Sequence, residues 1–309
     1  MKVLDIHQLS EKIPEAIVTS GTFDGVHVGH KKILEGIANQ AKKNNGNSVA
    51  LTFWPHPRFI LNPDEKALRL LSTFEEKASL IGAVNIDYLI KIPFTEEFSQ
   101  LTSEQFVHQI LIERLGTKRL VIGYDHHFGK DRAGSLKFLQ RNKERFGFEV
   151  QEIPRQDIDH VGVSSTKIRT ALEQGQVHLA SEYLGHQYSI TGTVISGDKL
   201  GSKIGFPTAN ISISENYKLI PGDGVYAVKV EVNGQEYIGM LNIGFRPTIN
   251  SKGRKVEVNI FDFSDDIYDE SVTIKFVKRI RNETKFDGLD SLKKQLIRDK
   301  ASSLKILIR

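Results

Sequence analysis

Short apolar runs alternate with longer amphipathic segments over the first half of the chain. The apolar runs have the length and composition of buried strands and lie at 16–20, 49–53, 88–92, 119–123 and 148–153. Helical spacing of apolar residues between them predicts helices at 31–43, 74–83, 103–115 and 135–146. Buried strands joined by helices form a parallel sheet with right-handed crossovers, and such sheets bind ligands at the carboxyl ends of the strands. The first half is therefore predicted to be an α/β domain.

The hydrophobic period changes after two further helical segments, at 164–175 and 177–185. From about Gln187 onward, closely spaced alternating strands are separated by Gly, Pro and Asn. These strands are predicted at 188–196, 224–232, 235–244, 255–263 and 270–280. They indicate an antiparallel barrel or sandwich, on which an amphipathic helix at 289–307 should pack. We predict two domains, 1–186 and 187–309, with one large domain as the alternative.

Composition narrows the classes of function. The chain has no cysteine, which excludes disulfides, thiolate catalysis and Cys-ligated metal centres. Its 42 Lys and Arg against 38 Asp and Glu leave a net charge of +4 that is spread along the sequence, which favours anionic small molecules over nucleic acid as ligands. We find no signal peptide and no uncharged apolar run long enough to span a membrane. We therefore expect a cytoplasmic protein that binds neither membrane nor nucleic acid.

The segment Gly21–His30, GTFDGVHVGH, lies between the strand 16–20 and the helix that follows it. Its glycines allow backbone N–H groups to face an anion at a helix N-terminus. His27 and His30 lie on the same side of the first helical turn, where both imidazoles can donate to phosphate oxygens. A tight turn with two solvated histidines is the alternative, which the spacing disfavours. The turn lacks GxGxxG and the chain lacks GxxxxGK[ST], so neither common phosphate-binding motif is used.

GTFDGVHVGH resembles the HxGH motif of nucleotidyltransferases, in the form found in bacterial bifunctional riboflavin kinase/FMN adenylyltransferases, also called FAD synthetases. The resemblance implies a Rossmann-like domain in which His27 and His30 hold the ATP triphosphate and act in catalysis. A substrate phosphate would attack the α-phosphorus and pyrophosphate would leave, with catalysis by positioning and charge stabilisation. It also implies ATP contacts from the turn residues, which are Gly21, Thr22, Phe23, Asp24 and Gly25.

Two further segments of this domain match the same family. FWPHP at 53–57 corresponds to F-x-P-H-P, with an ordinary proline-rich loop as the alternative. The segment 121–134 places Asp125 in the flavin or nucleotide region, but His126 stands where the family more often has Phe, which leaves the flavin-stacking contact open. Asp125, His126 and His127 could also form a metal site, which we disfavour because no further ligand follows this segment at a suitable distance.

The segment 163–169, VSSTKIR, corresponds to the superfamily's ISSTxxR motif. Its serines can cap a helix while the arginine directs its guanidinium at phosphate. The resemblance implies ATP contacts from Ser164, Ser165, Thr166 and Arg169. A plain helix cap with a surface arginine is the alternative.

In the second domain, GDKLGSKIGFPTANI at 197–211 resembles the riboflavin kinase signature. Its glycines allow close approach of the backbone to phosphate. Thr208 and Asn210 alternate in an extended segment and so present oxygens on one side, as Mg²⁺ prefers. An ordinary Gly-Pro turn is the alternative. The resemblance implies that Thr208 and Asn210 are metal ligands and that the kinase ATP is bound by Gly201, Lys203, Gly205, Thr208 and Asn210.

Glu257 occupies the position of the family's catalytic glutamate, where it would accept the proton of the ribityl 5′-hydroxyl. A solvent-facing strand glutamate is the alternative. Asn259 stands where the family commonly has His, and Asp269 where it commonly has Gly, so flavin contacts or turn geometry could differ. The segment 281–286 matches R-x-E-x-K-F and implies flavin binding by Arg281 and Glu283, with plain surface charge as the alternative.

These matches predict a bifunctional enzyme of flavin cofactor biosynthesis. Residues 187–309 would convert riboflavin and ATP to FMN and ADP, and residues 1–186 would convert FMN and ATP to FAD and pyrophosphate. Mg²⁺ is expected in both steps, where it neutralises phosphate charge. We expect a monomer or a weak homo-oligomer.

Three other functions are weighed against this one. Adenylyl transfer to a nicotinamide or pantetheine precursor is disfavoured by the GFPTAN segment at 205–210. A flavin- or nucleotide-binding regulator without turnover is disfavoured because His27, His30 and Glu257 are retained. RNA binding is disfavoured because the charge is distributed and no RNP1 motif is present.

Overall fold

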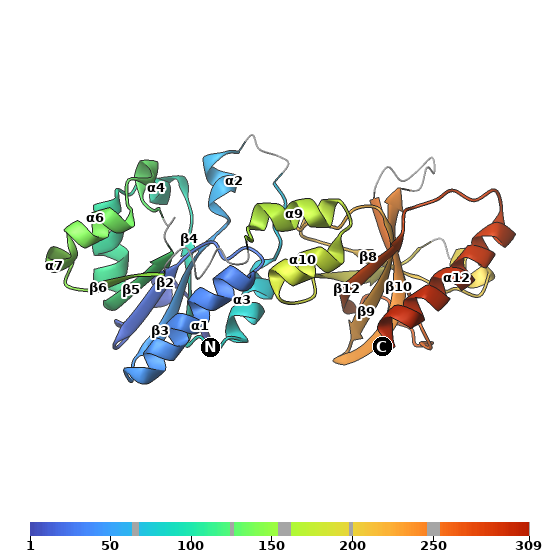
Figure 1. Ribbon diagram of the computed structural model, residues 1–309, viewed down its shortest axis with the longest axis horizontal. Coiled ribbons are helices and arrows are strands. Elements are labelled where there is room, and N and C mark those ends of the chain that lie inside the picture. Colours follow the sequence, from blue (N-terminus) through green and yellow to red (C-terminus); the bar gives the residue numbers. More distant parts are fainter. Residues whose placement is uncertain (64–67, 124–126, 154–161, 198–199, 246–253, 309) are drawn as a thin grey trace. The chain divides into compact units, whose positions relative to one another are not determined.

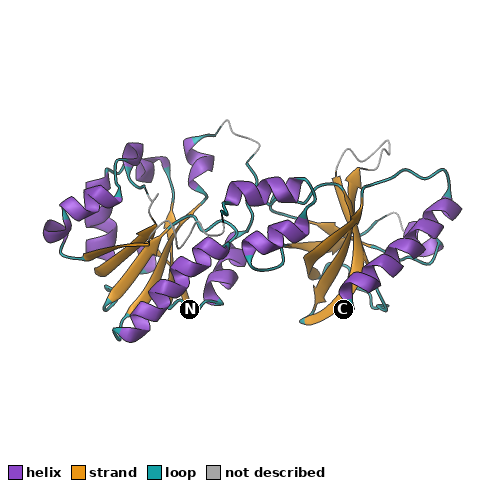
Figure 2. Cartoon of the chain, viewed as in Figure 1, coloured by secondary structure: helices purple, strands orange, loops and turns teal. Residues whose placement is uncertain are grey.

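The computed structural model describes residues 1–63, 68–123, 127–153, 162–197, 200–245 and 254–308. The chain divides into two compact units, Met1–Ser165 and Thr166–Arg309. Figures 1 and 2 show a helix-flanked sheet in the first unit and a barrel in the second. The structural boundary lies at the start of α9, and the predicted functional division at 186/187 stays a prediction.

The described part of the first unit contains a six-stranded sheet in the order β1-β4-β3-β2-β5-β6 (Figure 1). Every neighbouring pair is parallel, which confirms the predicted parallel sheet. The strands are β1 (Lys2–Asp5), β2 (Ala16–Ser20), β3 (Asn47–Trp54), β4 (Tyr88–Pro93), β5 (Thr117–Gly123) and β6 (Glu149–Ile153). From β2 the chain winds outward through β3 to β4 and then returns to β5 on the other side of β2. The carboxyl end of β2 is thus the point where the winding reverses, the usual ligand position in such sheets.

Alternate residues of the central strands pack against helices on opposite faces of the sheet. Ile17 of β2 lies in one apolar cluster with Leu34 and Ile37 of α1, whereas Val18 lies in the other with Phe106 and Leu111. The helices with α-helical geometry are α1 (Val28–Lys43), α2 (Pro57–Leu61), α3 (Phe74–Gly82), α4 (Glu96–Ser99), α5 (Ser103–Phe106), α6 (Leu136–Arg141) and α7 (Lys143–Phe146). The short 3₁₀ segments are η1 (Ile6–Gln8) and η3 (Lys130–Arg132), and a π-helix, η2 (Val107–Arg114), follows α5 directly. The helix predicted at 103–115 is thus α5 and η2 together, and the one predicted at 135–146 is divided between α6 and α7.

In the described part of the second unit, six strands form a closed barrel in the order β10-β11-β8-β7-β12-β9. All neighbouring strands are antiparallel, as predicted, and because the sheet closes on itself the barrel and not the sandwich is correct. The strands are β7 (Ser189–Ile195), β8 (Ala209–Ser212), β9 (Gly224–Val232), β10 (Gln235–Phe245), β11 (Arg254–Ile260) and β12 (Ser271–Arg281). The helix α12 (Leu289–Leu307) packs on β9, β10 and β12, as predicted for the terminal helix.

The helices α9 (Ser165–Glu173) and α10 (Val177–Leu184) are fixed to the second unit by backbone contacts. Gly222 N–H donates to the Leu172 carbonyl at 2.8 Å, and the Arg279 guanidinium donates to the Gln174 carbonyl at 3.2 Å. Gly175, with φ +73°, lies where a Cβ would come within 2.8 Å of the Tyr226 hydroxyl. These contacts explain why the structural boundary precedes α9.

Candidate active sites

The turn between β2 and α1 has an unusual backbone. Gly21 N–H donates to the Leu51 carbonyl at 3.0 Å, and Val26 N–H donates to the Phe23 carbonyl at 3.1 Å. Phe23 and Val26 have φ of 47° and 41°, in the left-handed region that side-chain-bearing residues rarely occupy, and Gly25 between them has φ 77°. Strained backbone of this kind concentrates at ligand sites, where surrounding contacts must hold it in place.

Asp24 supplies part of that restraint. Its side chain is buried, and Oδ1 accepts hydrogen bonds from the N–H groups of Leu71 at 2.9 Å and Ser72 at 3.2 Å. The Ser72 hydroxyl in turn accepts from Gly25 N–H at 3.1 Å. Ser165 Oγ donates to the Asp24 carbonyl oxygen at 3.2 Å, so two predicted site segments meet although 141 residues separate them. The Asp24 carboxylate therefore fixes the turn, and its predicted contact with ATP stays a prediction.

His27 and His30 form a stacked pair at the start of α1. Their ring centroids are 3.7 Å apart with an interplanar angle of 17°, and the edge of Phe23 meets His30 at 5.4 Å. His27 is the N-cap residue, and its Nδ1 accepts from His30 N–H at 3.4 Å. Since Nδ1 of His27 is an acceptor, the proton of the neutral ring is on Nε2, which can donate to a ligand.

Both imidazoles are neutral at pH 7. Burial lowers the pKa of His27 to about 4, against a smaller opposing effect of a backbone hydrogen bond. Burial also lowers the pKa of His30 well below its ordinary value, and the nearby His27 and Lys77 lower it further. His30 Nδ1 is a buried polar atom without a hydrogen-bond partner among the described residues. A buried nitrogen in this state is unfavourable until a ligand supplies a partner.

Lys77 is a functional candidate that the sequence reading missed. It lies on α3 with 1% of its surface exposed. Its Nζ is 3.5 Å from Thr52 Oγ1 and 5.0 Å from the centroid of the Trp54 ring. Burial lowers the pKa of Lys77 to about 8, although the charge of Asp24 opposes this shift. The available signal was its place between Phe74 and Ile81 on the buried stripe of α3.

The FWPHP segment has a mainly structural environment. The ring of Phe53 packs in an aromatic cluster with Phe94, Phe98 and Phe106. His56 is buried and caps α2, with Nδ1 accepting from Arg58 N–H at 3.2 Å.

For several predicted site residues the structure gives no contact that bears on ligand binding. Asp125 and His126 lie outside the described residues. Within the described ranges we find no group of three or more His, Cys, Asp or Glu side chains that could hold a metal. Ser164 and Thr166 are exposed and Arg169 is half-buried on α9. Their contacts with ATP stay predictions.

The glycine-rich segment of the second unit folds back on itself around α11 (Leu200–Lys203). The Gly201 carbonyl accepts from Ile204 N–H at 3.1 Å and from Phe206 N–H at 2.9 Å, and a Cβ at Gly201 would collide with the Phe206 carbonyl oxygen. Gly205 has φ 84°. The side chains of Ile204 and Phe206 pack in an apolar cluster, while Lys203 and Thr208 remain exposed. The glycines thus let the buried residues anchor a loop whose polar residues face outward.

The predicted base and a predicted metal ligand face each other across two strands. Asn210 of β8 is paired in register with Glu257 of β11, and Glu257 is paired with Asn242 of β10. Directly opposed residues point to the same face of a sheet with Cβ atoms about 5 Å apart. A Cβ on Gly197 would collide with the Asn210 amide, so the loop before α11 lies against this polar row. The structure brings these three side chains, contributed by three strands, together.

Both departures of the second domain from the family pattern have a local explanation. Asn259 Nδ2 donates to the Pro207 carbonyl at 2.6 Å, so it fixes the backbone next to Thr208. Asp269 has φ 63°, a conformation that suits glycine and that Asp tolerates better than most residues. Its N–H donates to the Val194 carbonyl at 2.9 Å, which closes the turn.

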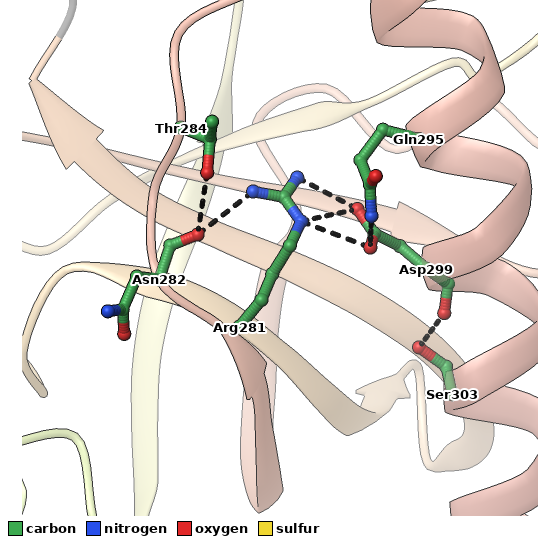
Figure 3. Close-up of polar contacts among 6 residues, drawn as sticks. All are labelled: Arg281, Asn282, Thr284, Gln295, Asp299 and Ser303. Atoms are coloured by element: carbon green, nitrogen blue, oxygen red, sulfur yellow. Dashed lines mark hydrogen bonds and ion pairs between the residues drawn. The ribbon is translucent and has the colours of Figure 1, made fainter.

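Arg281 connects the end of β12 to α12 (Figure 3). Its Nε lies 3.1 and 3.0 Å from the two carboxylate oxygens of Asp299, and a terminal nitrogen lies 2.8 Å from one of them. Asp299 is 1% exposed and also accepts from Gln295 Nε2 at 2.9 Å. Glu283 follows on the same loop, with its carboxylate over Gly244. The structure gives Arg281 a packing role, and flavin binding by Arg281 and Glu283 stays a prediction.

Comparison with known proteins identifies relatives of the whole chain. A family model described as FAD synthetase matches residues 9–167, and one described as riboflavin kinase matches residues 184–307. The chain is 38% identical over 305 residues to the bifunctional riboflavin kinase/FMN adenylyltransferase of Bacillus subtilis (strain 168), which covers 97% of this chain and 95% of that protein. The Escherichia coli (strain K12) protein of the same name is 35% identical over 300 residues, or 96% of this chain and 95% of its own length.

A solved structure also matches over nearly the full length. It is described as a macrolide-efflux protein from Streptococcus pneumoniae, with a TM-score of 0.86 and 31% identity over 98% of this chain and 99% of that one. Among the residues described here, none of the helices is both long and apolar enough to cross a bilayer.

Proposed function

We infer the activities of this chain from its family, since it belongs to the bifunctional riboflavin kinase/FMN adenylyltransferases. It phosphorylates riboflavin with ATP to give FMN, and it adenylylates FMN with a second ATP to give FAD and pyrophosphate. The observation that carries this conclusion is that both family models match in order, over residues 9–167 and 184–307. These ranges correspond to the parallel sheet and to the barrel.

For the adenylyltransferase step, we propose that the ATP polyphosphate binds at the turn before α1. The turn lies where the winding of the sheet reverses, its backbone is strained, and His30 Nδ1 lacks a hydrogen-bond partner within the part of the chain that the structure describes. An oxygen of the FMN phosphate attacks the α-phosphorus, and the bond from that phosphorus to the pyrophosphate oxygen breaks. The N–H groups of the neutral histidines donate to the phosphate oxygens and stabilise the negative charge that develops as pyrophosphate leaves. No covalent intermediate with the protein is required.

The remaining ATP contacts of this step are part of the same proposal. They come from the turn itself and from the start of α9, at Gly21, Thr22, Phe23, Asp24, Gly25, Ser164, Ser165, Thr166 and Arg169. The hydrogen bond from Ser165 Oγ to the Asp24 carbonyl supports a shared site for these two segments. Asp125 is proposed to contact the flavin.

For the kinase step, we propose that Glu257 is the general base. It accepts the proton of the ribityl 5′-hydroxyl while that oxygen attacks the γ-phosphorus, and ADP leaves. Asn210 and Thr208 offer hard oxygen ligands, which fit Mg²⁺, and the register that opposes Asn210 to Glu257 supports their action on one substrate pair. When bound, Mg²⁺ neutralises phosphate charge in both steps. Gly201, Lys203 and Gly205 contribute to ATP binding, and Arg281 and Glu283 to flavin binding.

We also propose that the enzyme works in the cytoplasm as a monomer or weak homo-oligomer. The absence of cysteine is compatible with a reducing compartment. Light scattering of the purified protein over a range of concentrations measures its mass, and a stable oligomer at low concentration would contradict this proposal.

One assay tests both activities. The purified chain is incubated with riboflavin, ATP and Mg²⁺, and the flavins are separated by chromatography. FMN should form first and FAD after it, and a parallel reaction that starts from FMN should give FAD with one pyrophosphate for each FAD. Absence of both products in a folded preparation would reject the enzyme.

A further inference from the structure

A buried ammonium group lies close to the strained turn of the first unit. Lys77 Nζ is 3.5 Å from Thr52 Oγ1, and that hydroxyl lies 3.4 Å from the carbonyl oxygen of Thr22 in the turn. The Trp54 ring covers the ammonium at 5.0 Å. This sequence of contacts connects Lys77 to the backbone of GTFDG through a single side chain.

The surroundings of Lys77 are poorly suited to a charge. Within the described residues it forms no ion pair, and its one hydrogen bond is long. The Asp24 charge reaches Lys77, but the two side chains form no ion pair in the described part of the chain, and Oδ1 of Asp24 accepts hydrogen bonds from the N–H groups of Leu71 and Ser72. A buried cation with so little compensation destabilises a fold, and an apolar residue of similar volume usually does better there. Lys77 is therefore not explained by packing.

We propose that Lys77 is a positioning residue for adenylyl transfer, whose fixed positive charge behind the turn attracts and holds the ATP polyphosphate. This rests on the proposed placement of ATP at the turn. In a buried site a charge acts over several ångströms with little screening, so the lysine need not touch the substrate. Burial is the main cause of the lowered pKa of His30, and the charge of Lys77 adds to it, so the ring stays a neutral hydrogen-bonding group.

The first test compares Lys77→Met and Lys77→Arg in the full-length chain. Lys77→Met should lower kcat/KM for FAD formation about tenfold or more, as for loss of an electrostatic contact in a preorganised site. Lys77→Arg should retain much more activity because it keeps the charge. Riboflavin phosphorylation in the same chain should not change, which controls for folding and for ATP quality. Lys43→Met removes an exposed lysine at the end of α1 and should behave as wild type.

A parallel His30→Ala variant distinguishes the placement of ATP at the turn from the role of Lys77. If His30→Ala leaves FAD formation intact, the placement of ATP is wrong. If His30→Ala abolishes it while Lys77→Met has wild-type kcat and KM, the placement stands and the role of Lys77 is rejected.

A spectroscopic test needs no turnover. Trp54 is the single tryptophan of the chain, so its fluorescence reports the ammonium that lies over its ring. Burial lowers the pKa of Lys77 to about 8, and the titratable groups that face it are the Asp24 carboxylate from the turn and the neutral His30 imidazole from α1. A fluorescence change with a midpoint near pH 8 should appear in wild type and be absent from Lys77→Arg and Lys77→Met.

Bound polyphosphate should move that midpoint. With ATP present and FMN absent, the wild-type transition is expected at higher pH, because a polyanion favours the charged ammonium. An unchanged midpoint at saturating ATP would overturn the proposal. If Lys77→Met does not fold, the comparison of wild type with Lys77→Arg, with and without ATP, still decides the question.

Discussion

Glu257 and Asn210 are directly paired across the antiparallel strands β11 and β8. Opposed positions place both side chains on one face, at a separation that a hydroxyl group or a hydrated metal ion can bridge. Asn242 extends the same row on β10. A carboxylate with two amide side chains can accept a proton and orient oxygen ligands at once, which is the chemistry that phosphoryl transfer to an alcohol requires.

Replacement of the proposed base tests the kinase site. Glu257→Gln preserves shape but removes the proton acceptor, and FMN formation should fall about 10²- to 10⁴-fold, the usual contribution of general base catalysis. FAD formation from supplied FMN should stay at the wild-type rate. Glu270→Gln, an exposed glutamate just before β12, is the matched control. Equal loss of both reactions would contradict separate sites.

Replacement of the proposed metal ligand has a different signature. Asn210→Ala should raise the Mg²⁺ concentration needed for half-maximal riboflavin phosphorylation several-fold, because one hard oxygen ligand is lost. The Mg²⁺ dependence of FAD formation should not move. A Mg²⁺ titration of each reaction in the same preparation measures both. A reduced maximal rate with an unchanged Mg²⁺ requirement would remove Asn210 from the metal site.

Sequence patterns predicted the architecture well because burial is periodic. The strands of the sheet are continuous apolar runs, and those of the barrel alternate, so both domain types could be recognised from residues 16–153 and 188–280. The strand β1 was missed because it has four residues and is partly exposed, and β8 because it follows a loop rich in Gly and Pro. Short strands form only by pairing with their neighbours, and local composition does not predict that pairing.

The sites were predicted less completely than the fold. Motif spacing located the His27–His30 pair, since residues three apart share a helix face. It could not show that both rings are neutral, because burial decides that and burial is a property of the assembled unit. Lys77 was missed for the same reason, since a lysine in a helical pattern normally lies in solvent. Flavin binding by Arg281 stays a prediction, and the motif did not indicate the hydrogen bonds that its guanidinium forms with Asp299.

The buried histidine pair predicts acid sensitivity of the first unit. His27 has an ordinary pKa of 6.5 and a folded-state pKa of about 4, so between these values the unfolded chain binds protons that the folded chain does not. Stability should therefore be lost as pH falls from 6.5 towards 4, by up to about 1.4 kcal/mol per pH unit for each such histidine. Urea unfolding at pH 7, 6 and 5, followed by the fluorescence of Trp54, measures this unit selectively.

A variant identifies the source of that pH dependence. His27→Asn keeps a side-chain acceptor at the N-cap of α1 but does not titrate. Its stability should fall less steeply between pH 6.5 and 5 than that of wild type. Identical slopes in the two proteins would mean that other groups cause the acid sensitivity.

The Arg281–Asp299 ion pair should contribute to the stability of the second unit, and variants of it can show whether Arg281 also binds flavin (Figure 3). Asp299→Asn leaves Arg281, whose side chain is 20% exposed, without its counter-charge, and it should destabilise the second unit by about 3 kcal/mol. Asp290→Asn, at the exposed start of the same helix, should change stability by about 0.5 kcal/mol or less. Thermal unfolding by circular dichroism and the thermal inactivation of riboflavin phosphorylation report this unit.

The double variant Arg281→Met/Asp299→Leu separates packing from flavin binding. When both charges are replaced by apolar groups of similar volume, the desolvation penalty disappears with the pair, and most of the stability lost in Asp299→Asn should return. If Arg281 only connects β12 to α12, the KM for riboflavin should return to the wild-type value as well. If Arg281 also contacts the flavin, stability should recover while that KM stays raised. Failure of the double variant to regain stability would show that the pair itself, and not the avoidance of a lone buried charge, holds this end of the barrel.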